Sequence, residues 1–131
     1  PKIRVASELD WPPFDFIQNG EPAGFAIDYV RLLAQIIGVE LEFVNGYTWT
    51  ELLEKGRKKE IDLFPGLWKS PDREKFLAFS HPYVQLIKVL ITRKDAPPVQ
   101  SLTDMTGQTI ALPAGYTLTE MVMDRQHGPG R

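Results

Sequence analysis

The sequence predicts an α/β domain with a mainly parallel sheet and flanking helices. Segments with strand and helix periodicity alternate in the order strand, helix, strand, helix, strand along the first half of the chain. Such alternation favours a parallel sheet joined by right-handed crossovers. The run 84–92 is almost wholly apolar, as in a strand buried on both faces. A chain of 131 residues can bury one sizeable core but not two complete ones.

The first elements follow from local patterns. Residues 3–7 predict a short strand, which the prolines at 12–13 prevent from continuing. Residues 14–22 predict a surface hairpin, because Asn19-Gly20 tolerates the positive φ of a tight turn. Residues 27–37 have apolar side chains at helical spacing, and Gly38 suits the left-handed residue that stops a helix.

The next elements continue the alternation. Residues 39–43 alternate apolar and acidic, which predicts a strand, and the pair Thr48 and Glu51 matches a capping box that opens a helix to about residue 59. Residues 61–64 predict a strand closed by Pro-Gly. A short helix is expected at Ser70-Pro71, with Ser as N-cap and Pro in the first position.

The charged, proline-containing stretch 93–98 predicts a domain crossing, so residues 1–95 and 96–131 are assigned to separate domains, the second one incomplete. Beyond the crossing, the pattern predicts in order a helical turn at 101–105, a reversal at Gly107, a strand at 109–112, a helix at 118–125 and an unstructured tail at 127–131.

Composition excludes several classes of partner and cofactor. The net charge is −2 with no long run of either sign, which argues against a nucleic-acid partner. No apolar run approaches the ~20 residues of a membrane span, so contact with a membrane is expected only through parts outside this sequence. There is no cysteine, and His81 and His127 lie in different segments, so neither a metal nor another cofactor is expected.

The three tryptophans each follow a predicted strand. Ligands of open parallel sheets bind beyond the carboxyl ends of the strands, and aromatic side chains make flat pocket walls. We therefore expect a small-molecule pocket at this edge, although a loop tryptophan is often only a packing lid. The residues placed there are Glu8, Trp11, Tyr47, Trp49, Gly66, Trp68, Lys69, Ser70 and Arg73.

Ser70 and Arg73 predict an anion site. Free amides at a helix start favour an anion, and an arginine in that first turn adds two parallel donors for a carboxylate. The alternative is that Arg73 pairs with Asp72 at the surface. Glu8 is the complementary group for a ligand ammonium, and its alternative is an exposed loop carboxylate.

Catalytic patterns are absent from the sequence. It has no glycine-rich phosphate loop, no Gly-x-Ser-x-Gly and no His-Glu-x-x-His, and residues 70–73 read Ser-Pro-Asp-Arg where a Ser-x-x-Lys motif needs lysine. We therefore expect a binding module, not an enzyme.

Several segments, in order, resemble the bacterial family 3 extracellular solute-binding proteins, which have the type II periplasmic binding or Venus-flytrap fold. They are Trp11-Pro12-Pro13-Phe14 with Gly24-Phe25-Ala26-Ile27-Asp28, Trp49 with Leu52-Leu53, Ile61-Asp62 through Ser70-Pro71-Asp72-Arg73, Phe79-Ser80-His81-Pro82-Tyr83, Ser101-Leu102 with Asp104 and Gly107, and Gly115-Tyr116-Thr117. The resemblance implies a periplasmic-binding-protein-like first lobe, a crossing strand, and the start of a second lobe that stays incomplete.

The resemblance also implies roles for individual residues. Glu8 would take a ligand amine, Trp11 and Trp49 would stack on the ligand, and Arg73 would hold its carboxylate. Ser70 and Gly66 would line the same side, and Gly115 and Thr117 would come from the second lobe. The ligand would be an amino acid or a related carboxylate, and the location periplasmic or on the extracytoplasmic face of the inner membrane.

The loop 65–69, Pro-Gly-Leu-Trp-Lys, differs from the small polar residues common in amino-acid transporters. It is more similar to sensor modules of membrane-bound histidine kinases or diguanylate cyclases. The alternatives are the binding component of an ABC importer and, from another class, an enzyme or a lytic transglycosylase front domain. We expect a fragment of a longer protein, whose residues 99–131 either pack against a second copy, giving a homodimer, or are poorly ordered.

Overall fold

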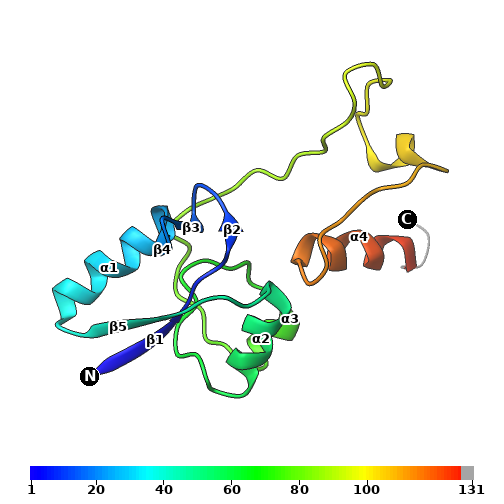
Figure 1. Cartoon of the computed structure of the whole chain (residues 1–131). Coiled ribbons are helices and arrows are strands. Elements are labelled where there is room, and N and C mark those ends of the chain that lie inside the picture. The colour runs from blue at the N-terminus through cyan, green and yellow to red at the C-terminus, as the bar shows by residue number, and fades with distance from the viewer. Residues whose placement is uncertain (128–131) are drawn as a thin grey trace.

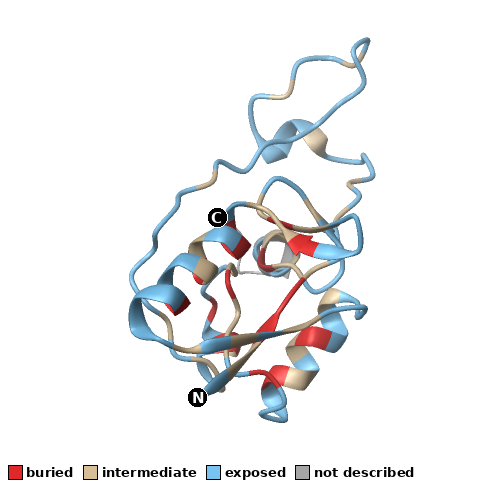
Figure 2. Ribbon diagram, turned by 60° about the vertical axis from the view of Figure 1, so that its left-hand side comes forward, coloured by how far each residue is buried: buried red, intermediate tan, exposed pale blue. Residues whose placement is uncertain are grey.

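The computed structural model describes residues 1–127 and is built around a pair of parallel strands (Figure 1). β1 (Lys2–Ala6) pairs with β5 (Glu40–Val44), as the alternating pattern of 39–43 predicts. In Figure 1 and Figure 2 the two long helices of the N-terminal half lie on opposite sides of this pair. The predicted α/β fold class is confirmed.

The third predicted strand, at 61–64, is reduced to a single bridge. Leu63 pairs in parallel with Val5, and its carbonyl oxygen accepts from the Ala6 amide at 2.9 Å. The pairing cannot extend further, because Pro65 follows and has no amide proton to donate. The segment still lies beside β1, as the predicted strand order requires.

A three-stranded antiparallel sheet covers one end of the parallel pair. β3 (Asp15–Gln18) and β4 (Glu21–Ala23) form the predicted hairpin, and Asn19 and Gly20 have φ values of 54° and 83° in its turn. Both positive values fit a two-residue turn of the kind that joins twisted strands. β2 (Asp10–Trp11), which the sequence patterns missed, adds a third strand to this hairpin.

α1 (Phe25–Ile37) packs one apolar face onto the strands. It begins after Gly24, whose φ is 115° and where a Cβ atom would collide with the carbonyl oxygen of Phe14. It ends at Gly38 in the left-handed conformation, as predicted. The residues buried along its inner face are Ala26, Ile27, Val30 and Ala34.

α2 (Trp49–Arg57) opens with the predicted capping box. The Thr48 hydroxyl oxygen accepts from the Glu51 amide at 3.3 Å, and the Glu51 carboxylate accepts from the Thr48 amide at 2.7 Å. These bonds satisfy amides that the first turn of a helix leaves free. The helix contributes fully buried Leu52 to a core shared with Ala6 and Ile61.

Two short elements and one longer helix follow, all at predicted places. α3 (Pro71–Glu74) has Ser70 as its N-cap, η1 (Leu102–Met105) is the expected helical turn, and α4 (Thr117–His127) is the last helix. The tail predicted at 127–131 lies outside the described residues, apart from His127 at the end of α4.

The strands predicted at 84–92 and 109–112 are wrong. Both segments are irregular, and 84–92 is mostly exposed, with Ile87 91% and Ile91 88% accessible. A strand needs a neighbour for its amides and carbonyls, and no segment among residues 1–127 pairs with either run. We call residues 1–83 the body and residues 84–116 the arm.

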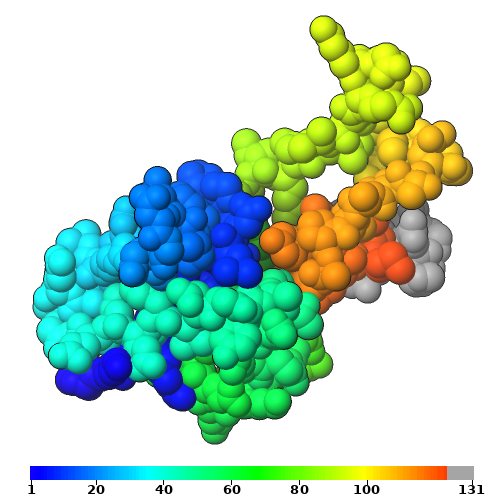
Figure 3. Space-filling view, in the orientation of Figure 1, coloured from blue at the N-terminus to red at the C-terminus, as the bar shows by residue number. Residues whose placement is uncertain are grey.

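The arm projects away from the body before the chain returns at α4, as Figure 3 shows for the yellow residues. Figure 2 shows burial confined to the body and to the start of α4. The division of the chain at residue 95 stays a prediction. None of the helices described, within residues 1–127, has the length and apolar character needed to cross a membrane.

Candidate functional site

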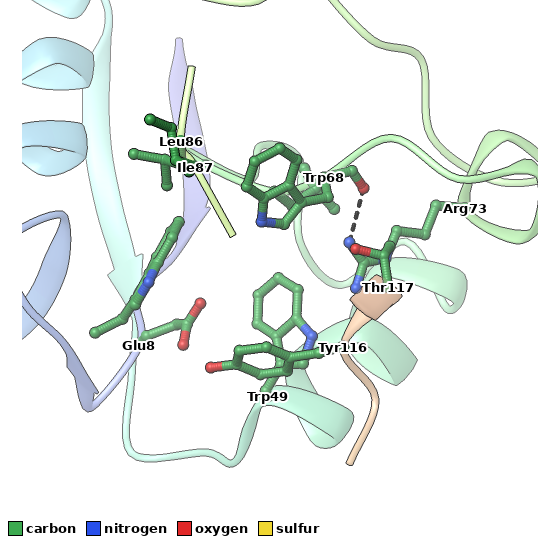
Figure 4. Close-up of a pocket in the computed structure, with 11 residues that line it drawn as sticks. Glu8, Trp49, Trp68, Arg73, Leu86, Ile87, Tyr116 and Thr117 are labelled. Carbon is green, nitrogen blue, oxygen red and sulfur yellow. Dashed lines mark hydrogen bonds between the residues drawn. The ribbon is translucent and has the colours of Figure 1, made fainter. Parts of the chain in front are cut away.

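A cavity of about 150 Å³ lies where the body meets the start of α4 (Figure 4). Loops that follow β1, β5 and the Leu63 bridge supply most of its walls. This is the edge of the sheet that the strand-end rule selects. Of the eleven predicted residues, Tyr47 and Lys69 do not line it, and seven of the other nine do: Glu8, Trp11, Trp49, Gly66, Trp68, Arg73 and Thr117.

The other two predicted residues, Ser70 and Gly115, lie behind the lining. The Ser70 hydroxyl oxygen accepts from the amide of Arg73 at 3.3 Å, so its role in this structure is to cap α3. The Gly115 carbonyl oxygen accepts from the indole nitrogen of Trp49 at 3.2 Å and from Arg73 Nη2 at 3.1 Å. Both residues therefore support the side chains that face the cavity.

Arg73 is the central cation of the site. It is only 4% exposed, which excludes the alternative of a surface pair with Asp72. Its Nη1 donates to the Trp68 carbonyl oxygen at 2.7 Å, the bond dashed in Figure 4, and its guanidinium lies 5.4 Å from the ring centroid of Trp49. Asp72 instead pairs with Arg57 on the surface, with Nη2 2.6 Å from its carboxylate. Burial lowers the pKa of Arg73, while nearby acids, Glu120 first, oppose that shift.

Glu8 is the acidic side chain of the cavity wall. Burial first, and then the negative charge of Asp15, raise the pKa of Glu8 to about 7, although the positive charge of Arg73 acts to lower it. Asp15 holds the Glu8 backbone, because its carboxylate accepts from the Glu8 amide at 2.9 Å and from the Ser7 hydroxyl at 3.1 Å. Burial raises the pKa of Asp15 to about 6, against the effect of those two bonds.

The tryptophans are half-buried walls. Trp11 packs against Phe14 with ring centroids 5.0 Å apart, and Trp49 meets Phe64 edge-on at 6.0 Å. Trp68 is 36% exposed. Trp11 and Trp49 thus each pack against a phenylalanine and also line the cavity, which suits stacking on a flat ligand group.

Sequence reasoning missed four lining residues: Leu67, Leu86, Ile87 and Tyr116. Tyr116 could have been found, because it lies between the two predicted residues Gly115 and Thr117. Leu86 and Ile87 could not, because the predicted buried strand at 84–92 placed them in a sheet. Burial raises the pKa of Tyr116, and the negative charges of Glu8 and Asp10 add to that shift.

A second, larger hollow of about 1350 Å³ lies between residues 59–69 and 76–87. Its walls are mostly apolar and include Phe64, Phe76 and Phe79. Its charged lining residues are Lys59, Asp62 and Lys69, and no arginine is among the described residues that line it. The smaller cavity is the better candidate site, because it brings one acid, one buried guanidinium and three indoles together.

The chemistry available at the cavity is binding chemistry. Arg73 can hold an anion, Glu8 can face a cation, and the indoles can cover a flat group. Among the described residues, no group of three or more His, Cys, Asp or Glu side chains could hold a metal ion.

Two relatives with similar sequences are named as a binding protein and a sensor protein. The arginine-binding extracellular protein ArtP of Bacillus subtilis is 28% identical over 115 residues, which are 87% of this chain and 44% of ArtP. The virulence sensor protein BvgS of Bordetella pertussis is 32% identical over 113 residues, 86% of this chain and 9% of BvgS. The chain thus spans less than half the length of these relatives.

Solved structures with a similar fold include a sensor domain. A histidine kinase sensor domain with similarity to periplasmic binding proteins matches with a TM-score of 0.82 and 29% identity, over 97% of this chain and 56% of that one. Most relatives are named as binding or sensor proteins, and some as membrane-bound lytic murein transglycosylases. Residues 3–125 match the family as a whole. The chain therefore belongs to the bacterial extracellular solute-binding proteins, family 3, and is an extracytoplasmic domain.

Proposed function

We propose that this domain binds a small carboxylate solute, amino-acid-like in character, in the cavity between Arg73 and Glu8. The observation that carries the proposal is the buried guanidinium of Arg73 among three indole rings. A buried cation favours an anionic guest, because the guest offsets the cost of removing the charge from water. Arginine is named as the ligand of ArtP, so L-arginine is the first solute to test.

Glu8 gives the proposed site its second charge. A carboxylate with a raised pKa gains a proton easily when the cavity is empty and loses it when a cation arrives. We propose that Glu8 faces the ligand ammonium, and that Trp11 and Trp49 cover the ligand between the two charged ends. Gly66, Trp68, Ser70, Gly115 and Thr117 complete this proposed site.

Calorimetry with the chain and L-arginine, and then L-glutamine, tests the proposal. Arg73→Ala should weaken binding about ten- to a hundredfold, because a charge-assisted contact contributes ~1.5–3 kcal/mol. Arg93→Ala is the control, since the side chain of Arg93 is 87% exposed and lies in the arm. Equal affinity of Arg73→Ala and wild type for a carboxylate would contradict the assignment. Arg73→Lys should rescue binding only in part, because lysine lacks the planar fork.

The proposed biological role is the sensory input of a transmembrane histidine kinase or diguanylate cyclase. The likeness to BvgS and to a kinase sensor domain supports this role. The likeness to ArtP supports the alternative, a binding component of an ABC importer. The genomic sequence flanking this coding region tests the choice: a membrane span followed by a kinase or cyclase supports the sensor, and neighbouring permease genes support the importer.

An enzymatic role is the candidate from another class, and we propose that the domain is not an enzyme. Thr117 carries the one serine or threonine hydroxyl among the described lining residues, and His81 does not line the cavity beside it. A transglycosylase domain encoded in the same gene would assign the chain to the front of an enzyme instead.

A further inference from the structure

Asp15 is a buried carboxylate directly behind the acidic wall of the cavity. It is 3% exposed and lies at the start of β3, where it pairs with Trp11 of β2. One of its carboxylate oxygens accepts from the Ser7 hydroxyl at 3.1 Å, and the other accepts from the Glu8 amide at 2.9 Å. Glu8 and Trp11 both line the cavity, so Asp15 fixes the loop that carries them without lining the cavity itself.

The two hydrogen bonds of Asp15 do not require a negative charge at this position. A serine hydroxyl can donate or accept, so an asparagine in the same place could accept from the Glu8 amide and donate to Ser7. None of the ion pairs among the described residues 1–127 includes Asp15 or Glu8. A buried charge without an ion-pair partner costs stability. The charge of Asp15 therefore needs a reason other than the shape of the loop.

Two acids and one arginine set the charge at this side of the cavity. The groups that face Glu8 are Asp15 from β3, Arg73 from α3 and Tyr116 from the segment before α4. Asp15 is also faced by Tyr83, and burial raises the pKa of both tyrosines, so they stay neutral at neutral pH. Figure 4 shows the Glu8 carboxylate pointing toward Tyr116 across the cavity. Arg73 is the one cation among these described groups, so this side of the cavity has room for a second.

We propose that Asp15 is a positioning residue that keeps a proton on Glu8 while the cavity is empty, so that a ligand cation displaces this proton when it binds. The inference rests on the proposed function, because it concerns the cation-binding half of the same site. In the exchange, the Glu8 carboxyl loses its proton to solvent, and the ligand ammonium or guanidinium becomes the partner of the carboxylate. Burial and the charge of Asp15, which raise the pKa of Glu8 against the effect of Arg73, support this exchange. The alternative is that Asp15 only ties the loop together.

The affinity for L-arginine at pH 6 and pH 8 tests the exchange. In wild type the Kd should be about tenfold lower at pH 8, because a proton no longer competes with the ligand cation. Asp15→Asn can keep both hydrogen bonds, and its Kd should differ only about twofold between the two pH values, because Glu8 gives up its proton more easily. An Asp15 that only ties the loop predicts equal weakening at both pH values, and that result would overturn the proposal.

Asp10→Asn is the matched control for the lost charge. Asp10 lies in the same loop as Glu8, at the start of β2, but its side chain is exposed, so water and salt screen its charge. Asp10→Asn should keep the tenfold pH dependence. Calorimetry at pH 7 in phosphate and in Tris counts the protons released by L-arginine: about half a proton per ligand in wild type and in Asp10→Asn, and less than about 0.2 in Asp15→Asn. The same count in all three proteins would overturn the role of Asp15.

A ligand-free measurement separates this inference from the proposed function. NMR of the Glu8 side-chain carboxyl carbon, assigned with Glu8→Gln, should show a titration midpoint about one pH unit lower in Asp15→Asn than in wild type. Equal midpoints would refute the inference. If L-arginine binds through Arg73 with no dependence on pH, the proposed function stands and only the proton exchange is refuted. If L-arginine and L-glutamine both fail to bind, the proposed function is refuted, and the exchange with it.

Discussion

The body and the arm have similar apolar content but opposite structures. In the body, Val5, Ile27 and Leu52 are fully buried, whereas Ile87, Val89 and Ile91 in the arm are 71–91% exposed. Every strand pair of the described residues lies in the body. Apolar residues alone therefore do not make a core: they also need a backbone that has found its hydrogen-bond partners. In the body, β1 pairs with β5 on one side and with Leu63 on the other. No described segment of the arm pairs with a strand.

The largest expected difference in stability comes from replacing one leucine by alanine in each region. Leu52→Ala should lower the free energy of unfolding by about 2–5 kcal/mol, because it leaves a cavity in a fully packed site. Leu90 is 43% exposed in the arm, so Leu90→Ala should change stability by less than about 0.5 kcal/mol. Urea unfolding followed by circular dichroism measures both. A comparable loss from Leu90→Ala would mean that the arm shares the core.

Two glycines with positive φ give the next contrast. Gly24→Ala should cost about 1–3 kcal/mol, because it combines a left-handed backbone with a collision against the carbonyl of Phe14. Gly107 in the arm has φ of 79° and open space around its Cβ position. Gly107→Ala should leave the unfolding midpoint of the body unchanged. If both substitutions lowered that midpoint equally, unfolding of arm and body would be coupled.

Removing a helix cap in each region should give a smaller difference in stability. Thr48→Ala should destabilise the body by about 1 kcal/mol, because two amides at the start of α2 lose their cap. Ser101 holds the equivalent position before η1 in the arm, where its hydroxyl contacts Thr103 Oγ1 at 2.6 Å. Ser101→Ala should leave global unfolding unaffected and speed amide exchange only at 102–106. A global effect of Ser101→Ala would contradict the separation of the two regions.

The smallest expected effect depends on pH. The pKa of Glu8 rises from 4.5 to about 7 on folding, so the folded state binds more protons and stability is lost as pH rises between these values. Glu8→Gln removes this pH-dependent loss of stability. The difference in free energy of unfolding between variant and wild type should therefore shift in favour of the variant from pH 4 to pH 8. Because the cavity is open to solvent, we expect that shift to be below about 1 kcal/mol. Asp95→Asn, in the exposed arm, should follow the wild-type profile. Parallel urea midpoints of wild type and Glu8→Gln at both pH values would contradict a raised pKa.

Local signals in the sequence predicted the body well. Asn19-Gly20, Gly38 and the Thr48–Glu51 box each act through contacts within a few residues, so their outcome does not depend on the rest of the fold. The ends of β1, of β5 and of the Leu63 bridge then placed six predicted residues around one cavity, and Thr117, expected from the family resemblance, is the seventh.

The strands predicted in the arm were wrong for a physical reason. An apolar run such as 84–92 shows what could be buried, but a strand also needs a partner that the run itself does not specify. Ile87 consequently lines the cavity instead of a sheet. Arg73 was placed correctly, but its two carbonyl partners were not predicted, because one of them comes from residue 115, far along the chain.

The clustering of buried residues between 5 and 73 also has a consequence for synthesis. Domains made on the ribosome can begin folding from the N-terminus as the chain emerges. Every strand pair described here, and every buried position described here except Thr117, precedes residue 84 in the chain. These residues therefore leave the exit tunnel before the apolar run at 84–92 does. The nascent body can therefore be complete when that run emerges, and Trp49 gains its hydrogen-bond partner only when Gly115 has emerged as well.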